Sequence, residues 1–241
     1  MILNQGIKAA ITAALTLSLC CGFSAQSLAD TISILGTGKV GGALGVRFSE
    51  LGHTIIYGSR TPDSENVKEL VAQTEGAASA ATTIEAAQQG DIVVLALPWA
   101  VTEEVVKSLG DLSGKIIIDP TNPIARNADG GMDHSVETSL AELIQGWLPD
   151  AYVVKAFNAL SFTTMADPDS AGGLVSIPLA GNDEGAKAKV ASLVEGIGFE
   201  AIDLGPVQYA HEIEGLLVLW INARNNGQPF NYYFRPLEDN E

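Results

Sequence analysis

Cysteine and histidine are scarce in this 241-residue sequence, which contains two cysteines and three histidines. Cys20 and Cys21 both lie within the first 29 residues, so the remaining chain offers no thiol for a disulfide bond or a thiolate metal site. His134 and His211 are far apart in the sequence and belong to no H-x-x-x-H motif or histidine pair. We therefore expect no metal site, and we interpret both histidines as structural or exposed.

Basic residues and long apolar runs are also few. The sequence has 13 lysines and arginines against 29 aspartates and glutamates, which gives a formal net charge of −16. A surface this acidic argues against nucleic acid or an anionic membrane as the partner. After residue 29 there is no run of about 18 apolar residues, so the sequence predicts no membrane span in the rest of the chain.

Motifs for nucleophilic or acid–base catalysis are missing as well. No serine lies in a G-x-S-x-G motif, and Asp203 and Glu212 have no evident partner for proton transfer. Glu103 and Glu104 fit a solvated helix face better than a catalytic pair of carboxylates. The sequence therefore assigns no catalytic residue.

Residues 1–29 have the pattern of a secretory signal peptide. Lys8 precedes an uncharged apolar run from residue 9 to 23, and small residues follow at Ser27 and Ala29. This pattern predicts export to the periplasm or the medium, with a mature chain of residues 30–241. Two alternatives remain open. One is lipidation at Cys20 or Cys21, and the other is an extra N-terminal helix or an over-long start in a cytoplasmic protein.

The strongest motif lies between Thr31 and Arg60. An apolar strand, TISIL, runs into Gly36, Gly38 and Gly41 in the order G-x-G-x-x-G, and a helical pattern and a second apolar strand follow. In a dinucleotide-binding unit the first glycine permits a sharp turn and the second lets the backbone approach a pyrophosphate. The third glycine lets the helix pack closely on the strand. The helix N-terminus then offers free N–H groups to the phosphates.

The end of the second strand indicates which nucleotide binds. An NAD-selective unit places a carboxylate there for the ribose 2′-hydroxyl, whereas this sequence has Ser59, Arg60 and Thr61. The planar guanidinium of Arg60 can pair with a 2′-phosphate, which a carboxylate would repel. We therefore predict NADP(H) as the cofactor; the alternative is that Arg60 is a solvated loop charge.

The pattern after Arg60 alternates short apolar runs with helical periodicity, which is typical of a doubly wound, mostly parallel α/β sheet of the Rossmann type. We predict strands at 91–98, 115–119, 152–157, 173–181 and 199–205, and helices at 63–73, 82–88, 99–109, 135–147, 184–197 and 208–224. Residues 30–241 form one predicted NADP-binding domain, in which about 173–241 are a C-terminal αβ extension. We expect an irregular loop at 125–134. The aromatic tail at 229–237 packs on the sheet or a second subunit, or stacks on the cofactor.

Several blocks of the sequence together resemble a known family, over nearly all of residues 31–237. They are GTGKVGGALG, YGSR, VVLALPW, IIIDPTNP, VVKAFNAL and IPLAGNDEGAKAKVASLVEGIGFEAIDLGP. The family is that of the NADP-dependent oxidoreductases typified by the NADPH:coenzyme F420 oxidoreductase, and its relatives include the cytoplasmic domain of the six-transmembrane metalloreductases. The resemblance implies a Rossmann fold, NADPH binding and a homodimer, while the electron acceptor varies among relatives.

The resemblance also implies roles for individual residues. It places Thr37, Gly38, Lys39 and Val40 around the pyrophosphate, Ser59 and Arg60 at the 2′-phosphate, and Leu97, Pro98 and Asn122 along the cofactor. Open α/β sheets bind ligands at the carboxyl ends of their strands. A deazaflavin or flavin acceptor is accordingly expected near Phe157, Asn158 and the loop at Gly181.

Two functions from different classes remain open. The leading hypothesis is an oxidoreductase that transfers a hydride between NADPH and a deazaflavin such as coenzyme F420, or a flavin. Such a reaction needs two rings held in contact and requires no dedicated acid or base. The alternative is a scaffold or sensor that binds NADP(H) without turnover. A β-hydroxyacid or pyrroline-carboxylate type of reductase is disfavoured, because too few residues follow Gly205 for the separate helical region of those enzymes.

Overall fold

The structure is a computed structural model that describes residues 29–237. The strands of its main sheet are β1 Thr31–Leu35, β2 Thr54–Ser59, β3 Ala78–Thr82, β4 Ile92–Leu95, β5 Ile116–Asp119, β8 Tyr152–Lys155, β9 Ser176–Gly181 and β10 Glu200–Asp203. They lie side by side in the order β10-β9-β8-β5-β4-β1-β2-β3. Residues 1–28, which hold both cysteines and nearly all of the predicted signal peptide, lie outside the described residues.

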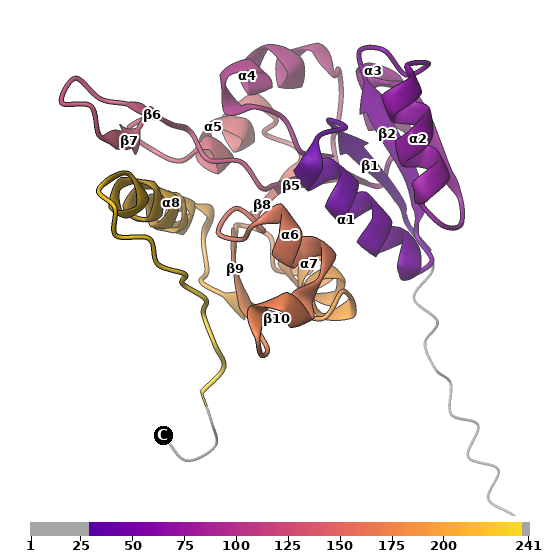
Figure 1. Cartoon of the computed structure of the whole chain (residues 1–241). Coiled ribbons are helices and arrows are strands. Elements are labelled where there is room, and N and C mark those ends of the chain that lie inside the picture. The colour runs from indigo at the N-terminus through magenta and orange to yellow at the C-terminus, as the bar shows by residue number, and fades with distance from the viewer. Residues whose placement is uncertain (1–28, 238–241) are drawn as a thin grey trace, which may run out of the picture.

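Helices cover both faces of this sheet (Figure 1). They are α1 Lys39–Glu50, α2 Glu65–Gln73, α3 Thr83–Gln89, α4 Trp99–Ser108, α5 Leu140–Trp147, α6 Phe162–Ala166, α7 Glu184–Gly196 and α8 Ala210–Asn225. Side chains alternate between the two faces of a strand, so Ile34 packs in one core with α1, α2, α6 and α7. The next residue, Leu35, packs in a second core with α3, α4, α5 and α8. The prediction of a Rossmann-type, mostly parallel sheet is confirmed.

Six strands, β3-β2-β1-β4-β5-β8, run parallel to one another. β9 runs antiparallel to β8, with Val154 opposite Gly181, and β10 runs parallel to β9. The reversal separates the carboxyl end of β9 from the carboxyl ends of the other six strands. The expectation that the loop at Gly181 faces an acceptor beside Phe157 is therefore wrong. That loop leads toward the amino end of β8, whereas Phe157 follows its carboxyl end.

The segment 125–134 differs from the expected irregular loop. It forms an antiparallel hairpin of β6 Ile124–Arg126 and β7 Met132–His134, which projects beside α8 (Figure 1). Asn222 on α8 holds the hairpin, since its Oδ1 accepts from Met132 N at 2.7 Å and its Nδ2 donates to Met132 O at 2.7 Å. Two hydrogen bonds between one pair of residues thus fix the hairpin to α8.

The aromatic tail packs against the start of β9. Phe234 O accepts from Ser176 N at 2.9 Å, and the Arg235 guanidinium donates to Leu174 O and Ala171 O. This arrangement agrees with the predicted packing on the sheet. Within residues 29–237, no helix combines the length and the apolar character that crossing a membrane requires.

Candidate functional site

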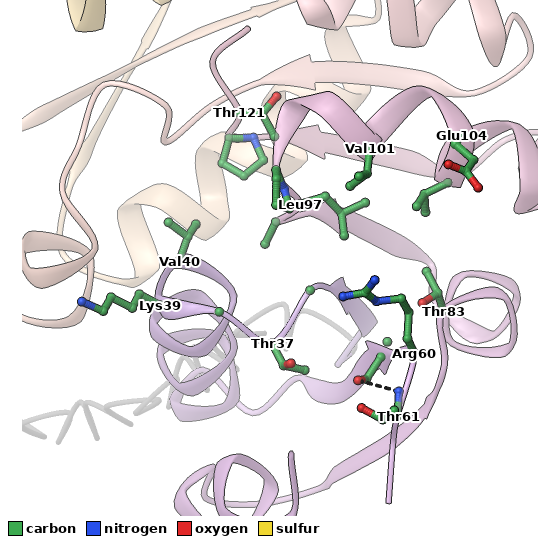
Figure 2. Close-up of a pocket in the computed structure, with 18 residues that line it drawn as sticks. Thr37, Lys39, Val40, Arg60, Thr61, Thr83, Leu97, Val101, Glu104 and Thr121 are labelled. Atoms are coloured by element: carbon green, nitrogen blue, oxygen red, sulfur yellow. Dashed lines mark hydrogen bonds between the residues drawn. The ribbon is translucent and has the colours of Figure 1, made fainter. Parts of the chain in front are cut away.

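A cavity of about 710 Å³ lies at the carboxyl ends of β1, β2, β4 and β5 (Figure 2). The predicted cofactor residues that line it are Gly36, Thr37, Gly38, Lys39, Val40, Ser59, Arg60, Leu97 and Pro98. Parallel strands of an open α/β sheet bind their ligands at this edge. The structure therefore brings together in one cavity most of the residues that the motif and the resemblance select.

Gly36 and Gly41 are required by the fold itself. Gly36 has φ +109°, and its N–H donates to Gly58 O at 3.0 Å, which ties the turn after β1 to β2. A Cβ atom on Gly36 would lie 2.2 Å from Ala96 O, and one on Gly41 would lie 2.1 Å from Gly36 O. Both contacts are far shorter than van der Waals distance, so glycine at 36 lets the turn lie against Ala96, and glycine at 41 lets α1 pack against the turn. Gly41 lies beneath the turn and does not line the cavity.

Gly38 is different, because the described chain leaves its Cβ position empty. Apart from Gly38 itself and its neighbours along the chain, no described residue has an atom within 4 Å of a Cβ built there, and its φ of −81° suits any residue. Gly38 is also the N-cap of α1, which has no side-chain cap and no acidic residue in its first turn. The helix therefore presents unpaired N–H groups and the positive end of its dipole to the cavity. An absent side chain above such a helix end fits a bound pyrophosphate.

The Arg60 side chain extends into the cavity from the end of β2, while Ser59 Oγ accepts from Thr61 N at 3.1 Å (Figure 2). Within the part of the chain that the structure describes, Arg60 makes no ion pair with a carboxylate. A guanidinium that points into a cavity without a carboxylate partner suits an anionic group such as a 2′-phosphate. This geometry supports the cofactor interpretation of Arg60 over a solvated loop charge.

Lys39 lies at the rim of the cavity and points away from Arg60 (Figure 2). Its ammonium stands 4.8 Å from the centre of the Phe162 ring on α6. A cation over an aromatic face is held there by the ring quadrupole. Lys39 therefore offers the cavity its backbone N–H at the start of α1, while its charge contacts α6.

The opposite end of the cavity is lined by Leu97, Pro98, Pro120 and Thr121. A buried ionic group lies behind Thr121. Lys155 Nζ is 2.9 Å from Asp119 Oδ2 and 2.6 Å from Glu214 Oε1, and it also donates to Thr121 O. All three charged side chains have no exposed surface. This group ties β5, β8 and α8 together and fixes the backbone of the cavity wall.

Burial shifts the ionisation of Glu214. It raises the pKa of the Glu214 carboxyl to about 7, with the nearby carboxylate of Asp119 adding to the increase. The Lys155 ammonium and the Leu140 N–H oppose this shift because they stabilise the charged form.

Asn122, Asn158 and Phe157 do not line this cavity. Asn122 Nδ2 donates to Asn158 O at 3.0 Å, and Asn158 Nδ2 donates to Asn122 Oδ1 at 2.9 Å and to Ile213 O at 3.3 Å. The pair joins the ends of β5 and β8 to α8. The Phe157 ring is 1% exposed and packs edge-on against Phe48, so it cannot stack on an acceptor in this conformation.

A smaller hollow of about 150 Å³ lies just after β8. It is lined by Asn158, Leu160, Trp220, Tyr232 and Tyr233 among others. Aromatic side chains of this kind favour planar, partly apolar ligands. The predicted acceptor region therefore contains a hollow, but its aromatic walls come from α8 and the tail.

Sequence reasoning missed several residues that line the main cavity. They are Gly58, Thr83, Ala96, Val101, Glu104, Val105, Pro120 and Thr121. Thr83 begins α3, and Val101, Glu104 and Val105 lie on α4. Neither helix carries a nucleotide motif, so only the position of these helices beside β2 and β4 could have identified them. Glu104, interpreted from the sequence as part of a solvated face, is exposed and also borders the cavity.

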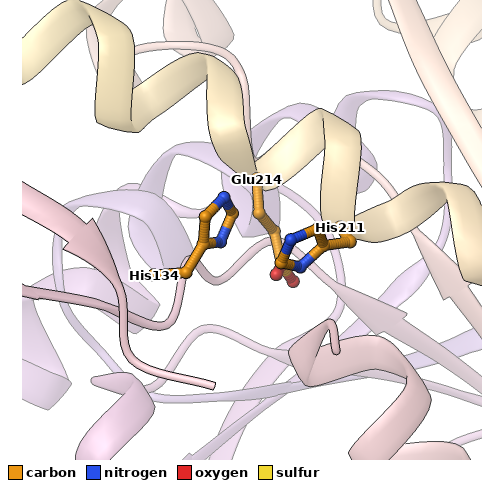
Figure 3. Close-up of side chains that lie close together, drawn as sticks. All are labelled: His134, His211 and Glu214. Carbon is orange, nitrogen blue, oxygen red and sulfur yellow. The ribbon is translucent and has the colours of Figure 1, made fainter. Parts of the chain in front are cut away.

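The two histidines that are far apart in the sequence lie together in the structure. His134 and His211 form a pair, with ring centres 4.0 Å apart and planes 24° from parallel, and Glu214 lies beside them (Figure 3). The hairpin that carries His134 folds back onto α8, which the sequence does not reveal.

Comparison with known proteins places this chain in a family. The model of the family described as NADP oxidoreductase, coenzyme F420-dependent, matches residues 31–123. The F420-dependent NADP reductase of Methanocaldococcus jannaschii is 33% identical over 204 residues, which cover 79% of this chain and 90% of that protein. The chain belongs to this family of NADP-dependent oxidoreductases. The expectation of that family from the sequence blocks is confirmed.

Other relatives and structures agree with this assignment. The metalloreductase STEAP3 of Rattus norvegicus is 27% identical over 78% of this chain, a match that spans 36% of the metalloreductase. The crystal structure of a protein assigned as an F420-dependent NADP-reductase of Arthrobacter sp. FB24 superposes with a TM-score of 0.76 and 31% identity. It covers 86% of this chain and 99% of that chain. A reductive aminase of Aspergillus terreus, solved with NADPH, shares 20% identity and a TM-score of 0.59 and shows likeness of fold alone.

Proposed function

We propose that this chain transfers a hydride between NADPH and an acceptor. The acceptor is a deazaflavin of the coenzyme F420 type or, alternatively, a flavin. The observation that carries the proposal is the single cavity that runs from the Arg60 guanidinium, past the uncapped start of α1, to Leu97 and Thr121. In an extended NADPH molecule the 2′-phosphate, the pyrophosphate and the nicotinamide follow one another in the same order. The relation to reductases named for F420 supports the choice of acceptor.

In this proposal, different parts of the cavity bind different parts of NADPH. The N–H groups at the start of α1 hold the pyrophosphate and Arg60 holds the 2′-phosphate. Leu97, Pro98 and Thr121 bound the end that remains for the nicotinamide. NADPH, when bound, supplies the hydride, and the chain contributes by orienting the two rings and excluding water.

We place the acceptor at the carboxyl edge of β8, where the hollow lined by Trp220 and Tyr232 opens. Trp220 Nε1 donates to Phe230 O at 2.8 Å, which fixes the orientation of the indole. A fixed aromatic wall offers a planar ring a stacking surface at a small entropic cost. Asn158 lines this hollow and would border the acceptor, whereas the buried Phe157 supports the wall from beneath.

Anaerobic stopped-flow mixing of the purified protein with NADPH and either F420 or FMN tests the proposal. We expect NADPH fluorescence to decay with F420 at a rate that saturates with acceptor concentration. Trp220→Leu should slow this decay while the NADPH affinity stays within a few-fold, because Trp220 lies outside the cofactor cavity. Trp147→Leu, which alters a tryptophan on α5 outside both cavities, is the matched control.

NADPH that binds tightly but is oxidised by none of these acceptors would contradict the proposal. That result would favour the alternative function, a scaffold or sensor that binds NADP(H) without turnover. Equal oxidation of NADPH in the two tryptophan variants would leave hydride transfer intact and remove the aromatic hollow from the account.

We propose in addition that a second copy of the chain covers α8 and the tail. Leu219 on α8 is 64% exposed, and Phe230 and Leu237 in the tail are 43% and 78% exposed. Apolar side chains clustered at one side of a molecule mark association surfaces. Light scattering during size-exclusion chromatography should give twice the mass of one chain, and the mass of one chain would contradict this proposal.

A further inference from the structure

His134, His211 and Glu214 converge from two elements, the β6–β7 hairpin and α8 (Figure 3). His134 ends β7, and the other two residues lie one turn apart near the start of α8. One nitrogen from each ring and one carboxylate oxygen all lie within 4.8 Å of one another. The double hydrogen bond from Asn222 to Met132 holds the hairpin against α8, so the convergence does not depend on the histidines alone.

The Glu214 carboxylate has one oxygen without a partner. Oε1 accepts from Lys155 Nζ at 2.6 Å and from Leu140 N at 3.1 Å. Oε2 has no hydrogen-bond partner among the described residues. Because the side chain has no exposed surface, bulk water does not reach this oxygen either. A buried carboxylate oxygen of this kind costs free energy unless a donor or a cation satisfies it.

The charges of the buried ionic group also favour a bound cation. In the ionic group behind the cavity wall, one ammonium, Lys155, faces two carboxylates, Asp119 and Glu214. The negative charges exceed the positive ones when both carboxylates are ionised. A cation bound at Oε2 would balance this excess inside the protein, where the effective dielectric constant is low.

The histidines are arranged as ligands. His211 Nδ1 lies 2.8 Å from Thr138 O, and because a carbonyl only accepts, Nδ1 carries the proton and Nε2 keeps its lone pair. A backbone carbonyl that fixes the tautomer in this way is the usual support of a metal-bound histidine. His134 Nδ1 is buried and has no hydrogen-bond partner within residues 29–237, so its ring can turn without losing a bond.

We propose that His134, His211 and Glu214 form a site for one divalent transition-metal cation of the Zn²⁺ and Co²⁺ class. Two imidazoles with one carboxylate suit these borderline cations, whereas Mg²⁺ and Ca²⁺ prefer oxygen ligands alone. Three protein ligands and a water make the tetrahedral set, in which ligand atoms stand about 3.3 Å apart. The ligand atoms now lie within 4.8 Å of one another, and rotation of the half-buried His134 ring, which breaks no hydrogen bond, would bring them closer. The cation then cross-links the β6–β7 hairpin to α8.

The test uses tag-free, chelator-treated full-length protein in which Cys20→Ser and Cys21→Ser remove the only thiols. Zn²⁺ is titrated by competition with a chromophoric chelator, and Co²⁺ absorption reports the coordination geometry. We expect one Zn²⁺ per chain and a tetrahedral Co²⁺ spectrum. In the NMR spectrum, Zn²⁺ should shift the ring signals of His134 and His211 and leave those of His53 in place.

Two variants and one control locate the site. His134→Phe keeps an aromatic ring against His211 but removes the ligand, and it should lower Zn²⁺ affinity by at least about a hundred-fold. Glu214→Gln should do the same. Glu212→Gln changes an exposed carboxylate on the same helix whose charge also acts on His134 but which is not a ligand, and it should lower the affinity far less than Glu214→Gln.

Three results would overturn the proposal. They are the absence of saturable Zn²⁺ binding, unchanged affinity in folded His134→Phe, and Zn²⁺ binding that disappears when the cysteines are replaced. The NMR shifts of the unaltered histidines decide the case if either variant is unstable, because shifts confined to His53 would place the cation elsewhere.

Discussion

Arg60 is the residue on which selectivity for NADPH rests in this account. Its guanidinium points into the cavity with no carboxylate partner among the described residues. Loss of a charge-assisted pair with the 2′-phosphate costs about 1.5 to 3 kcal/mol, roughly ten- to a hundred-fold in affinity. Arg60→Ala should therefore weaken NADPH binding by that factor and leave NADH binding nearly unchanged, as measured by fluorescence titration.

Lys68→Ala is the matched control, because Lys68 is an exposed cation on the neighbouring helix α2 and does not line the cavity. It should change neither affinity. An equal loss of NADPH and NADH binding in Arg60→Ala would show that Arg60 does not contact the 2′-phosphate.

Two glycines of the motif should respond in opposite ways to substitution. Gly38→Val should remain folded, because the described protein leaves that Cβ position empty, yet it should abolish nucleotide binding by filling the space for the pyrophosphate. Gly41→Ala should destabilise the fold, because its Cβ would meet Gly36 O at 2.1 Å. Nucleotide titration and thermal unfolding followed by circular dichroism measure both effects. Retained nucleotide affinity in folded Gly38→Val would contradict the assignment.

At the residue scale, the sequence predicts what a local motif encodes. Gly38 and Arg60 were identified because each has a fixed spacing from β1 in a dinucleotide-binding unit. Thr83 and Val101 line the same cavity without any motif, since their place follows from packing of α3 and α4. His134 and His211 stack at 4.0 Å although 76 residues separate them, and no short-range pattern records such a contact.

Among the elements, β5, β8 and α8 depend on the buried Lys155. Its ammonium bonds to Asp119, Glu214 and the Thr121 carbonyl, so Lys155→Met would leave two buried carboxylates without their cation. Removal of one partner from a buried ion pair costs about 3 to 5 kcal/mol. Urea unfolding should show a loss of this size.

Lys107→Met provides the comparison, because Lys107 also pairs with a carboxylate, Glu103, but both side chains are more than half exposed. Exposed pairs contribute little to stability. Similar losses in the two variants would show that the buried group does not hold these elements together.

The helices and buried strands were largely predictable, whereas the direction of β9 was not. Apolar runs such as IVVL in β4 signal a strand buried on both faces. β3, with the sequence ASAAT, carries almost no such signal because alanine has low β propensity. β9 has a clear apolar pattern, but the pattern is the same for either direction. The short α6 shows no helical periodicity in the sequence, and it does not carry the chain back along the sheet, so β9 starts near the carboxyl end of β8 and runs antiparallel to it.

For the whole molecule, we propose that residues 1–29 direct export and are then removed. The charged, apolar and small-residue segments of a signal peptide occur in order before the first residues of β1. N-terminal sequencing of protein from separated cell fractions should find a chain that begins near Asp30 outside the cytoplasm. An intact Met1 in the cytoplasmic fraction would contradict the proposal. Export would require that NADPH be supplied outside the cytoplasm.

In the proposed reaction, one cavity holds NADPH so that its hydride passes directly to a deazaflavin. Single-turnover reaction with NADPH deuterated at the transferred position of its nicotinamide, followed by mass spectrometry of the reduced F420, shows where this hydride goes. We expect one deuterium in each reduced F420, at a rate that falls in Gly38→Val. Reduced F420 without deuterium, or no reduced F420 from protein that binds NADPH, would contradict it.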